Sequence, residues 1–284
     1  MDRRRFVQTV SAAGAAAMLP RAAGAGWRPA LPVADHIDKV GLQLYTVRDL
    51  MQVSVEKTLS EVAKVGYKEV EFAGYFGRPP RAIKQLLDDN GLDSPSAHIG
   101  MDAIRGLWSR TCSDAAEIDH KYLVVASVPD SDMASVDAIK RLSDVLHKAA
   151  DDAREYHIKL AYHNHDAEFV QLDGKPKYDI LLEATDPDWL EMEMDIYWIT
   201  KGGGDPLYYW AKWPGRFPMV HVKDAGPPPD YKMEDVGKGT IDWVKLFSHH
   251  KEAGIKHYFV EHDNPPQPLQ DIKVSYGYLK NLEF

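Results

Sequence analysis

Four short apolar segments in the second half of the chain each end in side chains that bind metals. The segments are 159–165, 190–195, 218–224 and 258–263. Their metal-binding residues are His163, Asp195, His221 and Glu261. Imidazole nitrogens combined with carboxylate oxygens form a divalent-metal set, which favours Mn²⁺ or Zn²⁺ over Ca²⁺ and is compatible with Mg²⁺ or Co²⁺. If the four segments end at one place, they predict a metalloenzyme with one divalent metal ion.

Further polar residues adjoin these ligands. Alternation along a strand sends Lys223 to the same face as His221, and His165 to the same face as His163. Glu261, His165 and Lys223 are therefore candidates for proton transfer. Lys223 could instead extend to solvent at the rim, and Asp195 could simply cap the loop after its strand. Glu168 is a candidate substrate contact, and the sequence leaves open whether His163 or Glu168 completes the metal set.

A third group of residues suits a sugar. His98, Tyr45, Trp108 and Trp198 fall at or just after predicted strand ends. Aromatic rings at such a rim pack against the apolar faces of sugar rings. Ordinary packing is the alternative for each ring, as is a hydrogen-bonded core role for His98.

Strand-like and helix-like segments alternate through residues 40–284 and must position these groups. Strands are predicted at 40–45, 68–73, 94–99 and 122–128, followed by the four metal-type segments. Helices are predicted at 54–65, 81–90, 133–156, 178–184, 206–212, 242–253 and 269–281. Eight strands with right-handed crossovers predict an α/β fold, a single (β/α)₈ barrel whose strand ends meet at one mouth. An open doubly wound sheet is less favoured, because no G-x-G-x-x-G follows the first strand.

The first 39 residues precede the predicted barrel. Residues 1–25 carry Arg3-Arg4, a short alanine-rich apolar stretch and Ala23-Gly24-Ala25, the features of a twin-arginine export signal. Residues 26–39 are read as a linker, and residues 40–284 match the length of one barrel. This pattern predicts a periplasmic protein without a membrane span once the signal is removed.

Charge and cysteine content narrow the classes of partner. The net charge is −9 with no basic stripe, which argues against nucleic acid. The single cysteine, Cys112, excludes an internal disulfide. The expected partners are a small-molecule sugar and, at most, further copies of the chain in a homo-oligomer.

At these residues the chain resembles the xylose-isomerase-like TIM-barrel superfamily of sugar phosphate isomerases and epimerases. The resemblance runs from about Val40 to the C-terminus and rests on five strand endings. They are Gly41-Leu-Gln-Leu-Tyr, Ala161-Tyr-His-Asn-His, Met194-Asp, His221-Val-Lys-Asp and Val260-Glu. It implies one metal held by His163, Asp195, His221 and Glu261. Two positions depart from the family: His163 replaces a glutamate of the usual catalytic pair, and Trp198 replaces a zinc-binding histidine of the endonuclease branch.

The resemblance implies a metal-dependent sugar isomerase or epimerase working through an enediolate. A metal-dependent lyase or hydratase acting on 3-keto-glycosides shares the first chemical step and is favoured by export and by the missing glutamate. An exported carbohydrate-binding barrel without turnover is the non-enzymatic alternative, which the change at His163 would support.

Overall fold

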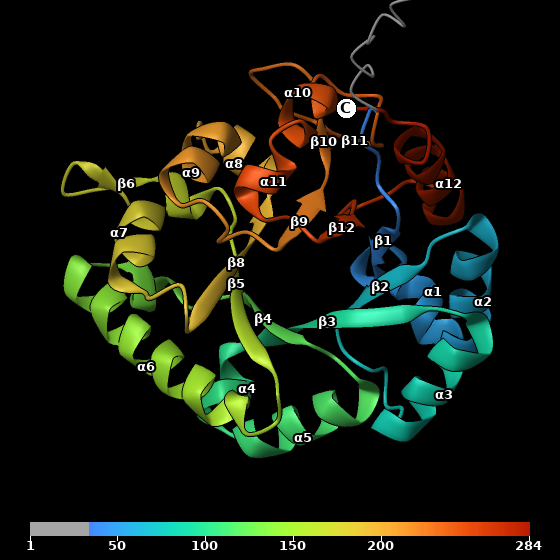
Figure 1. Cartoon of the computed structure of the whole chain (residues 1–284), viewed down its shortest axis with the longest axis horizontal. Helices are drawn as coiled ribbons and strands as arrows, with labels where there is room; N and C mark the ends of the chain where they lie inside the picture. Colours follow the sequence, from blue (N-terminus) through green and yellow to red (C-terminus); the bar gives the residue numbers. More distant parts are fainter. Residues whose placement is uncertain (1–33) are drawn as a thin grey trace, which may run out of the picture. The chain divides into compact units, whose positions relative to one another are not determined.

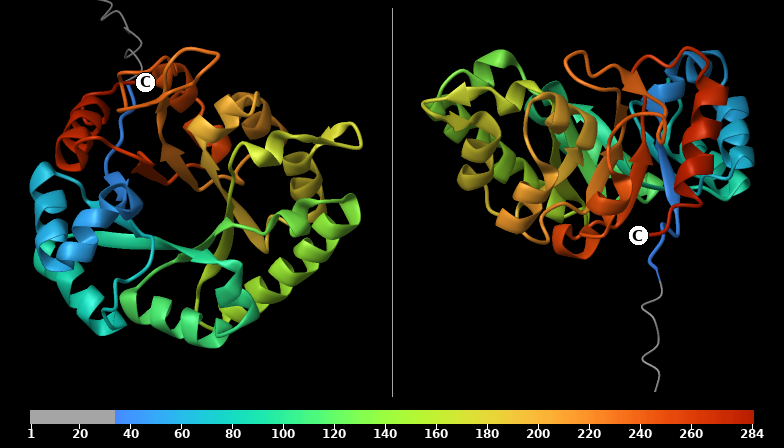
Figure 2. Two further views of the ribbon diagram at one scale, coloured as in Figure 1. Left: turned by 180° about the vertical axis from the view of Figure 1, so that it is seen from behind. Right: turned by 90° about the horizontal axis from the view of Figure 1, so that it is seen from above.

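The computed structural model describes residues 34–284, and within them eight parallel strands close into one barrel. The strands are β1 (Val40–Gln43), β2 (Glu69–Phe72), β3 (Asp93–Gly100), β4 (Tyr122–Ser127), β5 (Lys159–His163), β8 (Leu190–Asp195), β9 (Met219–Val222) and β12 (His257–Val260). Around the barrel they follow the order β1-β12-β9-β8-β5-β4-β3-β2. Figures 1 and 2 show the strands at the centre and the helices around them. The predicted (β/α)₈ barrel is confirmed.

The helices occupy the segments between the strands. They are α1 (Arg48–Val53), α2 (Val55–Val65), α3 (Pro80–Asn90), α4 (Met101–Arg105), α5 (Trp108–Ile118), α6 (Val136–Arg154), α7 (Lys177–Ala184), α8 (Ile196–Lys201), α9 (Pro206–Lys212), α10 (Trp243–Phe247), α11 (His250–Ala253) and α12 (Pro268–Leu279). The predicted helix 242–253 is wrong as one element, because it divides into α10 and α11. The Ser248 hydroxyl donates to the Lys245 carbonyl at 2.7 Å, which satisfies an acceptor of the last α10 turn.

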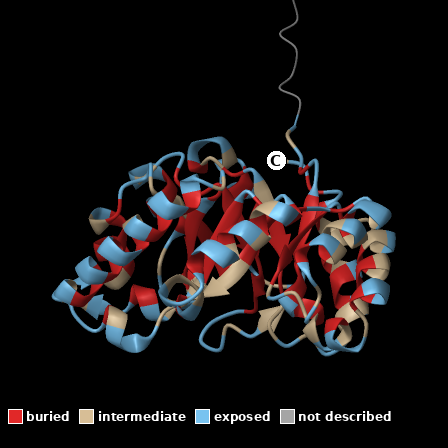
Figure 3. Ribbon diagram, turned by 90° about the horizontal axis from the view of Figure 1, so that it is seen from below, coloured by how far each residue is buried: buried red, intermediate tan, exposed pale blue. Residues whose placement is uncertain are grey.

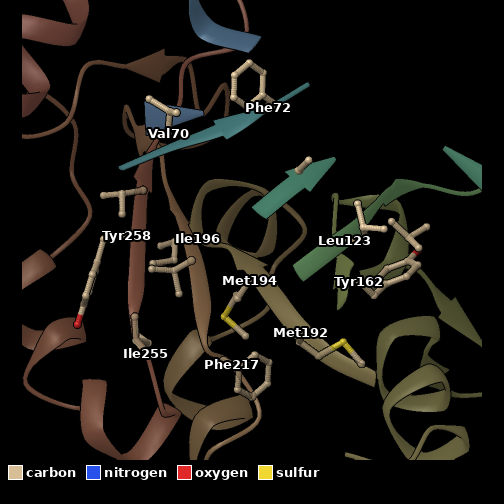
Figure 4. Close-up of a cluster of buried hydrophobic side chains, with 14 of the residues drawn as sticks. Val70, Phe72, Leu123, Tyr162, Met192, Met194, Ile196, Phe217, Ile255 and Tyr258 are labelled. Atoms are coloured by element: carbon tan, nitrogen blue, oxygen red, sulfur yellow. The ribbon is translucent and has the colours of Figure 1, made fainter. Parts of the chain in front are cut away.

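Side chains alternate along each strand between the helices outside and the barrel interior. Figure 4 shows the outward set, in which Val70, Phe72, Leu123, Tyr162, Met192 and Met194 pack in the buried apolar layer. In Figure 3 buried residues fill the strands and the inner helix faces, while exposed residues cover the outer helix faces. Because this apolar layer holds every strand on its outer side, the inward positions are free to carry polar groups.

An apolar plug fills the lower part of the barrel interior. It consists of Tyr122, Val124, Ala161, Met219 and Phe259. Gly41 is required beside it, since a Cβ at this position would lie 2.6 Å from the Phe259 ring. The plug closes the barrel below the functional groups and makes the strand C-terminal ends the open mouth.

The first predicted strand, 40–45, ends early. The Gln43 side chain accepts a hydrogen bond from the Tyr45 amide at 3.0 Å, and residues Leu44–Val47 turn into a 3₁₀ helix. This turn places Tyr45 over the mouth rather than in the sheet.

Outside the barrel proper, the described part of the predicted linker is residues 34–39. His36 forms an isolated antiparallel bridge with Glu283, and Ile37 is buried. The predicted export signal at 1–25, and residues 26–33 of the linker, lie outside the described residues. Within residues 34–284, none of the helices has the length and apolar character that crossing a membrane requires.

Candidate functional site

Four polar side chains from consecutive barrel strands meet at the mouth. His163 ends β5, Asp195 ends β8, His221 lies within β9 and Glu261 follows β12 directly. His221 Nδ1 lies 2.6 Å from Glu261 Oε2 and 3.9 Å from Asp195 Oδ2. His163 Nε2 lies 3.7 Å from the same Asp195 oxygen. The structure thus brings together all four residues that the sequence nominates as ligands; their binding of a metal stays a prediction.

The two oxygens of Asp195 have different surroundings. Oδ1 accepts a hydrogen bond from the Trp198 amide at 2.8 Å and caps the N-terminus of α8. Oδ2 faces the site and lies 2.9 Å from the Lys223 ammonium. One interpretation of the sequence expected Asp195 to cap the loop after its strand; it caps the helix α8 instead, while its other oxygen remains available at the mouth.

Lys223 is a buried cation, not a rim residue reaching for solvent. Its side chain is 2% exposed, and its Nζ lies 2.9 Å from Asp195 Oδ2, 2.7 Å from Glu261 Oε2 and 2.8 Å from Asp263 Oδ1. Although burial alone would lower it, these three carboxylates raise the pKa of Lys223 well above its usual range. Lys223 consequently holds its proton firmly and acts as a fixed positive charge.

Below this group lies a second polar layer, which contains Glu71 of β2, His98 of β3 and Glu193 of β8. Glu193 Oε2 lies 2.8 Å from His98 Nε2, 3.1 Å from His163 Nδ1 and 3.2 Å from His221 Nε2. Glu71 Oε1 lies 2.8 Å from His221 Nε2. Both glutamates are fully buried. These contacts orient the imidazoles that point to the mouth.

The electrostatics of the two layers follow from these contacts. Burial alone would raise the pKa of Glu261, but Lys223 and His221 hold it well below its usual range. Burial and the neighbouring His221 and His165 hold the pKa of His163 well below its usual value, so His163 is neutral. A neutral imidazole and an ionised carboxylate are the protonation states that a metal requires of its ligands, and His163 and Glu261 have them. Although burial alone would lower it, Glu193 and Glu261 raise the pKa of His221 well above its usual value, so His221 must release a proton when a metal binds.

The loop after β5 places His165. Glu168 accepts hydrogen bonds from the Tyr162 hydroxyl at 2.7 Å and from the His165 amide at 2.9 Å. The His165 ring lies 5.4 Å from the Trp198 ring, centroid to centroid. Glu168 therefore holds the loop that carries His165 and does not itself line the pocket, so the structure gives it a positioning role in place of the predicted substrate contact.

The mouth opens into a cavity of about 760 Å³. Its walls include seven of the predicted residues: Tyr45, His98, His163, His165, Trp198, Lys223 and Glu261. The opposite wall, at the ends of β2, β3 and β4, is made of Ala73, Gly74, Ile99, Gly100, Ala126 and Ser127. Apart from His98 of β3, the titratable groups thus occupy one side of the cavity and uncharged groups the other.

The prediction that Trp108 contacts substrate is wrong. Trp108 begins α5, is buried, and donates its indole N–H to the Ala149 carbonyl of α6 at 2.9 Å. The spacing of Trp108, Cys112, Ala115 and Ile118 is that of one buried helix face. That spacing was the available signal for a packing role and for α5 itself.

Sequence reasoning also missed Glu71, Gln43 and Asp263. Gln43 Nε2 donates to Glu71 Oε1 at 2.6 Å, and Asp263 is one of the three carboxylates around Lys223. Side-chain alternation was the available signal for Glu71, because Glu69 and Glu71 lie on the same face of β2, the one that points into the barrel. Asp263 lies beyond its strand, where alternation gives no direction.

Two compact groups of side chains have the composition of a metal site. Asp195, His221 and Glu261 form one, and His98, His163, Glu193 and His221 form the other. In each group the ligand atoms lie within 4.8 Å of one another. A buried Glu193 oxygen, Oε1, has no hydrogen-bond partner among the described residues, and neither does Glu71 Oε2. Excess buried carboxylate oxygen of this kind fits a bound cation.

Comparison with known proteins places these features in context. A family model described as a xylose isomerase-like TIM barrel matches residues 59–282. An inosose dehydratase from Lacticaseibacillus casei is 27% identical over 196 residues, which cover 61% of this chain and 64% of that protein's length. An inosose dehydratase from Geobacillus kaustophilus (strain HTA426) is 28% identical over 274 residues, covering 80% of this chain and 87% of the relative.

The fold also matches solved structures. A sugar phosphate isomerase/epimerase from Parabacteroides distasonis ATCC 8503 aligns with a TM-score of 0.76 and 27% identity, covering 86% of this chain and 98% of that one.

Proposed function

The chain belongs to the xylose isomerase-like TIM-barrel family, and from this premise we propose that it is a metal-dependent lyase of the dehydratase type. Its substrate would be a neutral keto-sugar or cyclic keto-polyol, and its reaction the β-elimination of water or an alcohol. The observation that carries the proposal is the one-sided distribution of titratable groups in the cavity, with His98 as the single exception among the described residues. The relatives named inosose dehydratase support it.

This distribution favours elimination over epimerisation. An epimerase must return a proton to the face of the carbon opposite the one from which it was removed, so it needs titratable groups on both sides. Among the described cavity-lining residues, the wall at the ends of β2, β3 and β4 carries one titratable group, His98, and its Nε2 is paired with the buried Glu193 at 2.8 Å and Glu71 at 3.1 Å. Elimination needs a base for a C–H bond and an acid for the leaving oxygen, and the strands from β5 to β12 can supply both.

Asp195, His221 and Glu261, with His163 beside them, would hold the divalent metal. This set contains oxygen and nitrogen donors, which suits Mn²⁺, Zn²⁺, Co²⁺ or Mg²⁺. When bound, such a cation polarises a substrate carbonyl and acidifies the adjacent C–H bond.

Glu261 is assigned as the base that accepts the proton from the carbon next to the carbonyl. As the C–O bond at the next carbon breaks, His165 donates a proton to the departing oxygen, which leaves as water or an alcohol. Carbon–carbon unsaturation forms and no external oxidant or reductant is needed. Lys223 is a poor proton donor because three carboxylates hold its proton, so its role is to keep Glu261 ionised and in place.

The substrate is expected to be unphosphorylated. Among the described residues, Lys223 is the one lysine or arginine that lines the cavity, and its ammonium is already surrounded by carboxylates. The three arginines that could reach the rim already form hydrogen bonds or ion pairs with other groups. Arg48 donates to the Asp263 carbonyl at 2.7 Å, while Arg78 and Arg105 pair with Glu56 and Asp132. A phosphate would therefore meet net negative charge and no free guanidinium there.

The test follows the metal-loaded protein with an inosose and with 3-keto-glycosides by NMR in D₂O. Loss of the leaving group with formation of an unsaturated ketone is the expected result. Glu261→Gln and His165→Ala should each lower the rate by about 10²–10⁴-fold per bound metal. Proton exchange without loss of the leaving group in every substrate would refute the assignment.

A metal-dependent isomerase or epimerase is the second candidate, supported by the name of the solved Parabacteroides relative. In the same experiment it would give ring-proton exchange and a new stereoisomer or aldose–ketose pair, with no unsaturated product. A carbohydrate-binding barrel without turnover would give neither exchange nor product.

A further inference from the structure

A second cavity adjoins the cavity of about 760 Å³ at the barrel mouth, and no step of the proposed reaction uses it. It has a volume of about 550 Å³, and we call it the side cavity. Its walls are made of Gly100, Met101, Asp102, Arg105, Ser127, Val128 and Pro129. Gly100 and Ser127 line both cavities, so the two spaces meet at this pair of residues.

The junction between the two cavities has small residues and a carboxylate. Gly100 and Ser127 face each other across the β3–β4 ladder, where its register is irregular. A Cβ on Gly100 would collide with Asp102 Oδ1, so the Asp102 carboxylate lies over the end of β3 itself. Arg105 pairs with Asp132, and within residues 34–284 no hydrogen bond or ion pair involves the Asp102 carboxylate. An acceptor without a partner therefore stands where the cavities join.

The walls of the side cavity are held by an ion pair between two segments. The helix α4 follows β3, and a 3₁₀ turn over Asp130–Met133 follows β4. Arg105 Nη2 of α4 donates to Asp132 Oδ2 of this turn at 2.6 Å. The pair fixes the two walls relative to each other, and the guanidinium keeps further N–H groups for another acceptor.

The barrel order places the side cavity across the mouth from the proposed base. In the ring of eight strands, β12 and β9 stand four places from β4 and β3, respectively, so they lie on opposite sides. Glu261 follows β12 and His221 lies in β9, whereas Ser127 ends β4 and Gly100 ends β3. A sugar ring that presents its acidic C–H bond to Glu261 thus has its far side toward the side cavity. His165, the assigned donor to the leaving oxygen, follows β5, which is the neighbour of β4.

The polar groups of the side cavity suit hydroxyl groups. The Asp102 carboxylate accepts hydrogen bonds, Arg105 donates them, and the Ser127 hydroxyl does both. Adjacent hydroxyls of a sugar offer the matching donors and acceptors. With Asp132 beside Arg105, the charges around the cavity sum to a net negative value, which disfavours a phosphate or a carboxylate as the occupant.

The apolar groups of the side cavity suit a sugar better than an aromatic ring. Met101, Val128 and Pro129 supply apolar surface against which the C–H groups of a sugar can pack. None of the described residues that line this cavity is aromatic, so an aryl group would find no ring to stack on.

We propose that the side cavity binds a second sugar ring, so that the substrate is a two-ring keto-glycoside and the leaving group is a sugar rather than water. This inference rests on the proposed function. As Glu261 accepts the proton from the carbon next to the carbonyl, the C–O bond to the second ring breaks and His165 gives that oxygen a proton. The products are the free second sugar and an unsaturated keto-sugar, so no oxidant or reductant is consumed.

The test compares a 3-keto-disaccharide with the 3-keto methyl glycoside of the same first ring, using metal-loaded full-length protein. The disaccharide should have a kcat/KM at least about tenfold higher. Asp102→Ala should lower this preference about tenfold, because it removes a charged hydrogen-bond acceptor. Asp130→Ala is the matched control: Asp130 is exposed on the neighbouring turn, lines neither cavity and should leave the preference unchanged.

Two results would overturn the inference and leave the proposed lyase intact. One is an equal kcat/KM for the two substrates, with an unsaturated ketone formed from both. The other is an equal advantage for an aryl 3-keto-glycoside that Asp102→Ala does not change, since the side cavity would then not recognise a sugar.

A binding measurement separates this inference from the proposed function. The unoxidised disaccharide and methyl glycoside have no carbonyl and are not converted, so their affinities are compared by calorimetry. At least about tenfold tighter binding of the disaccharide, lost in Asp102→Ala, supports the second-ring site even if no keto-sugar is converted. Equal affinities that Asp102→Ala leaves unchanged count against the site.

Discussion

Asp224→Asn should destabilise the protein by about 4 kcal/mol, because one carboxylate holds the loop between β9 and α10. Five N–H groups donate to Asp224, at 2.8–3.3 Å: the backbone amides of Ala225, Gly237, Gly239 and Ile241 and the indole of Trp243. Oδ1 accepts two of these bonds and Oδ2 accepts three. Asn has a single acceptor oxygen, so in either orientation at least two donors lose their acceptor. Hydrogen bonds to charged groups contribute about 1.5–3 kcal/mol each, which gives the estimate.

The measurement is urea unfolding at neutral pH, in which the midpoint should fall while its slope stays constant. Asp242→Asn is the matched control. Asp242 caps α10 through the Lys245 amide at 3.0 Å, and Asn caps a helix about as well as Asp, so its cost should be below about 0.5 kcal/mol. A loss of less than about 1 kcal/mol for Asp224→Asn would refute the reasoning.

The Asp224→Asn substitution should also affect the residues at the barrel mouth. The loop carries Tyr231, whose carbonyl accepts the Tyr197 hydroxyl at 2.8 Å, and Met233, whose sulfur lies 3.1 Å from the Asp263 amide. Asp263 in turn faces Lys223. Asp224 is therefore expected to support the site through the loop, and its loss should also weaken sugar binding.

Four further outcomes are expected. Burial lowers the pKa of His120 to about 4, below its value of about 6.5 in the unfolded chain. The stability present above the unfolded pKa is therefore lost as the pH falls toward 4, by ~3 kcal/mol. His120→Gln should remove this pH dependence of the unfolding free energy in urea unfolding. Trp108→Phe should cost about 1 kcal/mol of unfolding free energy for the lost Ala149 bond and leave sugar affinity, measured by calorimetry, unchanged. Lys223→Met should tighten Mn²⁺ binding about tenfold, because the ammonium repels a cation placed between the carboxylates it contacts; equal or weaker binding in a Mn²⁺ titration would contradict this. We also propose removal of residues 1–25 on export, and mass spectrometry of periplasmic protein should find an N-terminus near Gly26.

The barrel was predictable because its strands carry period-two signals that local sequence shows directly. In 190–195 the acidic positions Glu191, Glu193 and Asp195 alternate with apolar ones, and the structure puts the apolar positions against the helices. The metal-type residues at the four strand ends were predictable for a related reason. Parallel strands of a closed barrel end at one mouth, so their ends must meet whatever the loops do.

Other features depend on contacts between distant strands and were not available to such reasoning. The burial of Lys223 requires carboxylates from two other strand ends, so its own neighbours in sequence could not distinguish it from a rim lysine. The contact of Glu71 with His221 joins residues 150 positions apart. Trp108 was misassigned because a strand end was assumed where a helix begins, and its true partner lies on α6.

The alternation of side chains along a strand predicts which face of the strand a residue occupies, but not how high in the barrel its side chain lies. That height decides which side chains form a site together. Glu193 and Asp195 share a face, yet in the sheet Glu193 pairs with His163 on β5 while Asp195 pairs with His221 on β9. Since residues two apart on a strand are separated by about 6.6 Å, these carboxylates belong to different layers. A histidine ring can bridge such layers, because its two nitrogens point in different directions. His163 and His221 each do so, and for this reason one row of strand-end ligands in the sequence becomes two superimposed groups of potential ligands in the barrel.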